Sequence, residues 1–265
     1  MTAEDILARL DPFLQMGQAS VYAAFAVFAR VSAMVALLPG LGENALPARV
    51  KLGGALALGA LIWPAVAPLA DLVGATPAEL GRTMVAEAVC GMVLGLSVRL
   101  MIFALQMAGS MAAQATSVAQ MFGEGLTADP QPAYANLLAV AGIVLAFALG
   151  LPAYAAAALI ESYQHLPFGV FPLGAEVADW GARRVAGAFS LALSLAAPFV
   201  LAAFVYNVAL GAINKAMPQL MVAFVGAPAI TAGALLLMFL ATPVALRHWG
   251  DDLTDVMAAP LFARP

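Results

Sequence analysis

Long stretches without a charged residue are the feature of this sequence that most restricts its fold. Six such stretches occur, and they cover residues 12–29, 52–70, 100–123, 130–160, 185–214 and 216–246. A helix needs about 20 apolar residues to cross the ~30 Å hydrocarbon layer of a bilayer, so four stretches are long enough and the first two just sufficient. Only 10% of the residues are charged, against roughly 25% in an ordinary soluble domain. The sequence therefore predicts an all-α, polytopic membrane protein with about six hydrophobic segments.

Breaks rich in proline and glycine separate these segments and predict packed, broken helical hairpins. The breaks read PGLGENALP at 39–47, GEGLTADPQP at 123–132 and ESYQHLPFGVFPLG at 161–174, and such residues disfavour a continuous helix. Thr76-Pro77-Ala78-Glu79 is typical of a helix start. Pro152 predicts a kink inside the fourth segment.

The two ends of the sequence predict the extent of the membrane domain. We expect one membrane domain over residues 1–265, with a short lead-in at 1–17 and a polar, peripheral tail at 248–265. The N-terminus is acidic and lacks a basic region before an apolar core, so we expect the first apolar run to stay in the mature protein.

Several function classes are disfavoured by composition and motifs. The single cysteine, Cys90, excludes an internal disulfide framework, and a net charge of −4 offers no basic surface for nucleic acid. The sequence contains no HExxH, GxSxG or Walker motif. We therefore expect no enzymatic activity, no cofactor, no metal site and no nucleic-acid partner.

Three charged residues fall inside or beside hydrophobic segments. Arg30, Glu87 and Arg99 occupy positions where a charge costs about 2.5–3.5 kcal/mol at the centre of a membrane helix. They could snorkel to the surface or flank shorter spans. The interpretation that we favour is that they face other protein subunits or an aqueous path.

A stripe of polar side chains runs along one face of the third hydrophobic segment. Its members Gln106, Ser110, Gln114, Ser117 and Gln120 recur at helical spacing and share one face. Such a face either joins helices by hydrogen bonds or lines a water-filled conduit, and the sequence leaves both open. The spacing Gly91-x-x-x-Gly95 predicts close packing of two helices.

The stretch LGAINKAMPQLMVAFVGAP at 210–228 predicts a reversed hairpin. Pro218 ends or kinks the preceding helix near Ala216, and Lys215 lies in its last turn, where a cation suits the helix dipole. Gly226 and Pro228 are expected to interrupt the next segment. A broken helix at membrane depth needs protein or a cavity around it, which indicates a hairpin packed among partners.

The order and spacing of these motifs resemble the FliR family of flagellar biosynthesis proteins, the R components of the type III export gate. The resemblance covers nearly the whole chain. The matching positions are Arg30, Pro39, Pro47–Lys51, Glu87, Gly91, Gly95, Asp129, Pro130, Ser162, Leu166–Gly169, Leu210, Gly211, Lys215, Pro218, Gln219, Leu220, Gly226 and Pro228.

Three positions depart from the family pattern. Lys215 stands where the family usually has arginine, Met221 where it has asparagine and Ala223 where it has phenylalanine. Lysine cannot reproduce a bidentate arginine contact, so whatever the family holds at this position is held differently here.

The resemblance implies a subunit of a larger assembly in the bacterial inner membrane, at the flagellar basal body. P-type and Q-type gate proteins would be its direct partners, with a B-type switch protein and an A-type export protein nearby. Unfolded flagellar subunits would pass through the gate, and lipid would lie at its periphery. The implied subunit contacts fall on Arg30, Pro39, Pro47, Arg49, Glu87, Lys215, Pro218, Gln219, Gly226 and Pro228.

The resemblance also implies a plug inside the gate, formed by the loop after the third hydrophobic segment. In this sequence the loop runs from Gln114 to Pro130 and includes Ser117 and Gln120, with Met121, Phe122 and Gly123 at its tip. Methionine adapts to irregular contacts and glycine permits turns, which suits a closure that yields to a passing chain.

Three other functions fit parts of the pattern. An R-type subunit of a virulence injectisome would share fold and mechanism. A secondary transporter also uses discontinuous helices but predicts inverted repeats, and we find no clear internal repeat. A structural scaffold without its own conduit is the third alternative.

Overall fold

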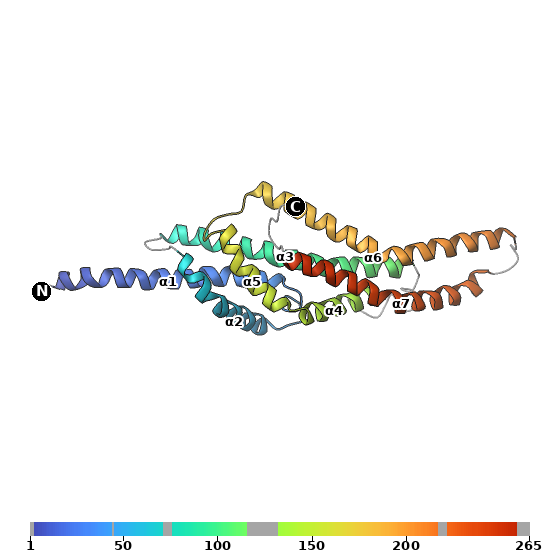
Figure 1. Ribbon diagram of the computed structural model, residues 1–265, viewed down its shortest axis with the longest axis horizontal. Coiled ribbons are helices and arrows are strands. Elements are labelled where there is room, and N and C mark those ends of the chain that lie inside the picture. The colour runs from blue at the N-terminus through green and yellow to red at the C-terminus, as the bar shows by residue number, and fades with distance from the viewer. Residues whose placement is uncertain (1–2, 44, 71–75, 116–131, 217–221, 259–265) are drawn as a thin grey trace. The chain divides into compact units, whose positions relative to one another are not determined.

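The computed structural model describes residues 3–43, 45–70, 76–115, 132–216 and 222–258, and every regular element in these ranges is a helix (Figure 1). This confirms the all-α prediction. In chain order the helices are α1 (Ala3–Leu37), α2 (Ala48–Val66), the short 3₁₀ helix η1 (Ala67–Leu69), α3 (Pro77–Ala115), α4 (Ala133–Ala148), α5 (Leu151–His165), α6 (Gly174–Ala216) and α7 (Val222–Ala258).

Most of these helices are long and apolar enough to cross a membrane. Within the described residues, five candidate spans cover Gly17–Leu37, Ala48–Leu69, Pro77–Ala115, Gly174–Ile213 and Thr231–Ala258. The pair α4 and α5 passes the same test together, with a bend of 69° between its members. The count of five, or six with this pair, confirms the predicted polytopic membrane protein.

Local sequence signals explain where two helices begin. At the start of α3, the Thr76 backbone N–H donates to Glu79 Oε2 at 2.8 Å and the Glu79 backbone N–H donates to Thr76 Oγ1 at 3.4 Å, which is the reciprocal pattern of a capping box. The predicted helix start is therefore confirmed. The bend between α4 and α5 lies at Gly150, whose φ of 90° is left-handed, and Pro152 follows in the first turn of α5. The predicted kink at Pro152 is thus a break between two helices.

The chain divides into two compact units. Unit 1 contains Met1–Arg99, Gly150–Ala182 and Asp255–Pro265, and unit 2 contains Leu100–Leu149 and Arg183–Thr254. Helices α3, α6 and α7 therefore each contribute residues to both units. The single domain over residues 1–265 remains a prediction.

Close contact between α1 and α3 forms the core of unit 1. A Cβ added to Gly91 would collide with the backbone carbonyl of Arg30, and one added to Gly95 would lie 2.7 Å from the Met34 carbonyl oxygen. Both distances are shorter than real Cβ contacts, so the two backbones approach this closely only because these positions are glycine. The predicted packing role of Gly91-x-x-x-Gly95 is confirmed.

A tryptophan of α7, Trp249, lies in the core of unit 2. The Trp249 side chain is fully buried, and its Nε1–H donates to the Met101 carbonyl at 2.8 Å. Tyr134 of α4 joins two other helices of this unit. Its hydroxyl lies 3.0 Å from Thr242 Oγ1 on α7, and its ring contacts the Phe199 ring on α6 with centroids 5.7 Å apart.

The prediction of a peripheral tail over 248–265 is wrong for its described part. Helix α7 continues to Ala258, and Trp249, Leu253 and Met257 are all buried. These residues recur at i, i+4 and i+8, so they form one apolar face of the helix despite the aspartates between them.

The hairpin at 210–228 is only partly as predicted. Helix α6 ends at Ala216 with Lys215 in its last turn, as expected. The predicted interruption at Gly226 and Pro228 is wrong, because α7 begins at Val222 and runs through both positions. A single proline removes one backbone hydrogen bond and bends a helix without always ending it. Pro64 and Pro198 likewise lie inside α2 and α6.

The contact between α1 and α3 can be tested by adding one methyl group. We expect Gly91→Ala to lower the Tm of the purified chain in detergent by roughly 2–10 °C, because overpacking costs about 1–3 kcal/mol. Gly81→Ala on the same helix is the matched control, since no atom lies within 4 Å of its added Cβ. The control should be neutral or slightly stabilising. Equal Tm values for the two variants would contradict the close approach.

Candidate functional site

A buried arginine is at the centre of the candidate site in unit 1. The Arg30 side chain, in the middle of the span formed by α1, has no exposed surface. Its Nε–H donates to Glu87 Oε2 at 2.7 Å and its Nη2–H to Glu87 Oε1 at 3.1 Å, so the ion pair with α3 is bidentate. Glu87 is also fully buried. Such a pair is geometrically specific as well as strong.

Arg30 also reaches the end of α5. Its Nη1–H donates to Ser162 Oγ at 2.8 Å, and its Nη2–H donates to the Leu166 carbonyl at 2.9 Å. The Ser162 hydroxyl in turn donates to the Leu159 carbonyl at 2.7 Å. The guanidinium therefore joins α1, α3 and the C-terminal end of α5.

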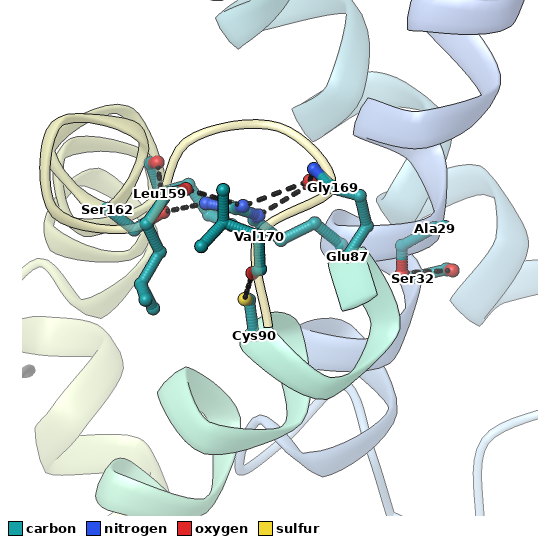
Figure 2. Close-up of polar contacts among 10 residues, drawn as sticks. Ala29, Ser32, Glu87, Cys90, Leu159, Ser162, Gly169 and Val170 are labelled. Carbon is teal, nitrogen blue, oxygen red and sulfur yellow. Dashed lines mark hydrogen bonds and ion pairs between the residues drawn. The ribbon is translucent and has the colours of Figure 1, made fainter. Parts of the chain in front are cut away.

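Glu87 also holds the loop between α5 and α6, because its Oε1 accepts a second hydrogen bond from that loop. The Gly169 backbone N–H donates to Glu87 Oε1 at 3.1 Å, and Figure 2 shows Gly169, Ser162 and Glu87 converging on the same group of contacts. Gly169 has φ 72°, and an added Cβ would lie 2.8 Å from Thr83 Oγ1. Only glycine satisfies both the left-handed backbone and the close approach to α3.

An aromatic ring closes one side of the site. The Arg30 guanidinium carbon lies 3.7 Å from the centre of the Tyr163 ring, which is a cation–π geometry. The Tyr163 ring also contacts Phe168, with centroids 4.5 Å apart. Together these contacts surround the cation with one carboxylate, one hydroxyl, one carbonyl and one ring.

The arrangement is suited to holding segments together. A buried charge is tolerated when it is paired and hydrogen-bonded, and the Arg30 guanidinium makes four hydrogen bonds, two of them to its counter-ion. Among the described residues, no group of three His, Cys, Asp or Glu side chains could hold a metal ion. We call the set Arg30, Glu87, Ser162, Tyr163, Leu166 and Gly169 the buried charge network.

These contacts correct the interpretation of two charges. Arg30 and Glu87 were expected to face other subunits or an aqueous path, and that expectation is wrong for both. Their partners lie in the same unit, and neither side chain reaches the surface. The partners on α5 and its loop are 132 and 136 residues from Arg30 in sequence, so local spacing gave no sign of them.

The third charge has a partner nearer the surface. Arg99 Nη1 forms an ion pair with Glu43, and the two side chains are 20% and 33% exposed. Lys51 Nζ, on α2, donates at 3.2 Å to the carbonyl of Gly42, which lies in the same segment as Glu43. The segment between α1 and α2 is thus held from α3 and from α2.

The other predicted site residues are not members of the set named above, and those of unit 1 that the structure describes are Pro39, Pro47 and Arg49. Pro39 is buried in the turn after α1, whereas Pro47, Arg49, Gln114 and Lys215 are exposed. Gln106 and Ser110 are half-buried. Several predicted positions lie outside the described residues, namely Ser117, Gln120, Met121, Phe122, Gly123, Pro218 and Gln219. The roles of all these residues stay predictions.

Sequence reasoning missed the part that Tyr163 plays. Ser162 was noted only through the resemblance, and Tyr163 was not singled out. A usable signal was present, because Glu161-Ser162-Tyr163 places three polar-tipped residues at the end of a long apolar run. Polar groups in such a position need partners, which indicates a nearby buried charge.

Comparison with known proteins supplies the family. Residues 21–256 match the family described as bacterial export proteins, family 1. The chain belongs to this family. The matched region contains every member of the buried charge network.

Relatives of known name cover almost the whole chain. The chain is similar to the "Flagellar biosynthetic protein FliR" of Caulobacter vibrioides, with 31% identity over 89% of this chain and 95% of the relative. It is 28% identical to the protein of that name from Pectobacterium carotovorum over 87% of this chain and 89% of the relative. It is 26% identical to the Escherichia coli protein of that name over 86% of this chain and 88% of the relative. With its apolar helices, this member of the export family is a multi-pass inner-membrane protein.

The network should respond to substitution as a coupled pair. We expect Arg30→Met to destabilise the chain by about 3–5 kcal/mol, because Glu87 would then be a buried charge without a cation. The double variant Arg30→Met/Glu87→Gln should be less destabilised than the sum of the two single variants. Thermal unfolding of the purified chain in detergent measures both.

Arg247→Met is the control for the loss of one arginine, because Arg247 is exposed in unit 2. Its effect should stay within about 0.5 kcal/mol, as for other surface substitutions. Strict additivity of Arg30→Met and Glu87→Gln would contradict a coupled network.

Proposed function

We propose that the chain is the R-type subunit of the flagellar type III export gate. In that role it is a component of the flagellar export apparatus and forms a protein-conducting channel with P- and Q-type subunits. The observation that carries the proposal is similarity over nearly full length, with 89% of this chain and 95% of the Caulobacter flagellar protein aligned. The flagellar names of the relatives favour this system over a virulence injectisome.

The surface of unit 2 supports assembly with other subunits. Beyond Val200, nearly every described side chain of α6 is at least partly exposed, including those of Leu201, Phe204 and Val205. With 43 residues, α6 is about 65 Å long, roughly twice the hydrocarbon thickness of a bilayer. Lipid cannot cover such a helix along its whole length if it crosses the bilayer once. The P- and Q-type subunits would cover the remainder.

The proposed partners also include a B-type switch protein, an A-type export protein and the basal body. Unfolded rod, hook and filament proteins are the proposed cargo. In this proposal the stretch Gln114–Pro130 forms the plug of the channel, with Met121, Phe122 and Gly123 at its tip. Gln114 is exposed in the last turn of α3, so the plug would begin where this helix ends.

A deletion strain tests the proposed function. We expect cells without this chain to be non-motile and to retain hook protein inside, because the gate through which hook subunits leave would be incomplete. The measurements are swimming in soft agar and hook protein in the culture supernatant, with the wild-type chain on a plasmid as the control. Normal swimming with normal hook export in the deletion strain would overturn the proposal.

The plug has its own test. We expect deletion of residues 120–125 in the assembled gate to raise ion conductance across the membrane, because the closure of the channel would be missing. Conductance is measured in cells or in reconstituted gates. Deletion of residues 71–75, which lie between η1 and α3 in the sequence, is the control for nonspecific damage. Unchanged conductance in the first variant would remove the plug assignment.

A further inference from the structure

A turn at the end of α5 has its backbone bound by the buried ion pair. The Leu166 carbonyl accepts a hydrogen bond from Arg30 Nη2 at 2.9 Å, and the Gly169 N–H donates to Glu87 Oε1 at 3.1 Å. A carbonyl and an N–H three residues apart commonly bond to each other in a turn, whereas here the ion pair binds both. We call residues 166–170 the clamped turn. Its position depends on side chains of α1 and α3.

The residues from Phe168 to Leu173 bury little apolar surface. Val170 is 48% exposed, Phe171 39% and Leu173 65%, and Phe168 is half-buried against the Tyr163 ring. These residues also have no regular secondary structure. Segments with few buried apolar contacts open at a lower free energy than the whole fold. The ion pair, more than apolar packing, therefore holds the clamped turn in place.

A tyrosine hydroxyl beside the ion pair has no hydrogen-bond partner among the described residues. The Tyr163 residue is only 3% exposed, and its ring centre lies 3.7 Å from the Arg30 guanidinium carbon. Its hydroxyl also interacts electrostatically with the Glu87 carboxylate. A buried donor without an acceptor destabilises a fold, so this hydroxyl needs an explanation.

We propose that the clamped turn opens while the rest of unit 1 stays folded, and that Tyr163 then replaces Gly169 as a donor to Glu87. In the closed state Glu87 Oε1 accepts hydrogen bonds from Arg30 and Gly169. When the turn leaves, the Phe168 ring leaves Tyr163, and the Tyr163 hydroxyl turns toward the oxygen that Gly169 has vacated. The carboxylate thus keeps its hydrogen bonds in both states.

The other groups also keep their partners when the clamped turn opens. Arg30 Nη2 retains Glu87 Oε1, and Arg30 Nη1 retains Ser162. The Leu166 carbonyl and the Gly169 N–H, released together, bond to each other as in an ordinary turn, for which proline at the second position is favoured. Unit 1 therefore contains a switch with two positions. This inference goes beyond the proposed function and does not depend on it.

The single cysteine of the chain provides the measurement. The Cys90 side chain is fully buried, and its thiol lies within 3.9 Å of the Val170 carbonyl oxygen (Figure 2). Opening of the clamped turn moves Val170 away from the thiol. The rate at which N-ethylmaleimide labels the full chain, purified in detergent and well below its Tm, therefore measures the population of the open state.

Tyr163→Phe tests the exchange of donors. We expect labelling of Cys90 to slow about ten-fold or more, because the open state loses a hydrogen bond to a charged group and the closed state loses none. The Tm should not fall. Tyr154→Phe removes an exposed hydroxyl from the same helix and should leave the rate unchanged. An unchanged or faster rate in Tyr163→Phe would overturn the proposal.

A second background separates the exchange from the simple removal of a buried hydroxyl. In Glu87→Gln the acceptor is neutral, and charge-assisted hydrogen bonds are roughly twice as strong as neutral ones. We therefore expect Tyr163→Phe to slow labelling only about three-fold in this background. Equal slowing in both backgrounds would mean that the hydroxyl does not bind the carboxylate in the open state, and the proposal would fail.

Gly169→Ala tests whether the clamped turn covers the thiol. Alanine disfavours φ 72°, and its Cβ would meet Thr83, so the closed state is destabilised and labelling should rise about five-fold or more. Gly174→Ala is the matched control, because no atom lies within 4 Å of its added Cβ. The proposal is wrong if Gly169→Ala leaves the rate unchanged. It is also wrong if wild-type labelling rises with urea as steeply as global unfolding, because no separate opening would then exist.

Discussion

A guanidinium enclosed in an apolar interior must find partners for its charge and its N–H groups, and unit 1 is arranged around that requirement. Arg30 takes a carboxylate from α3, a hydroxyl and a carbonyl from the end of α5, and an aromatic face from Tyr163. Removing one partner would leave a buried charge or a buried donor unsatisfied, which is far more costly than the loss of an exposed contact. The position of each of these segments therefore depends on the others.

The close contact of α1 and α3 and the ion pair between them support each other. Gly91 lies against the backbone of Arg30 itself, so the absence of a side chain at one position allows the charged side chain at the other to reach Glu87. On the far side, the same carboxylate accepts the N–H of Gly169 and fixes the loop that leads into α6. In this unit the close packing at Gly91 and the ion pair between Arg30 and Glu87 therefore depend on each other.

Much of the fold could be predicted from the sequence because its signals are local. Apolar runs gave the helical membrane class, and the Thr76–Glu79 box gave the start of α3. The site could not be predicted in the same way. Arg30 and Glu87 were recognised as unusual. The remaining hydrogen-bond acceptors of Arg30, however, are Ser162 and Leu166, which lie far along the chain. The tail was misjudged because its aspartates were weighed more than the i, i+4, i+8 spacing of Trp249, Leu253 and Met257.

The separation of Arg30 from its partners has a consequence for biogenesis. A ribosome adds about 5–20 residues per second, so the acceptors at Ser162 and Leu166 emerge roughly 7–27 s after Arg30. Glu87, the carboxylate that neutralises Arg30, is only 57 residues further along the chain and emerges roughly 3–11 s after it. The ion pair can therefore form first, and we expect the guanidinium to gain its other two acceptors only when the fifth helix has been made. Synthesis order and tertiary closure are coupled through one side chain.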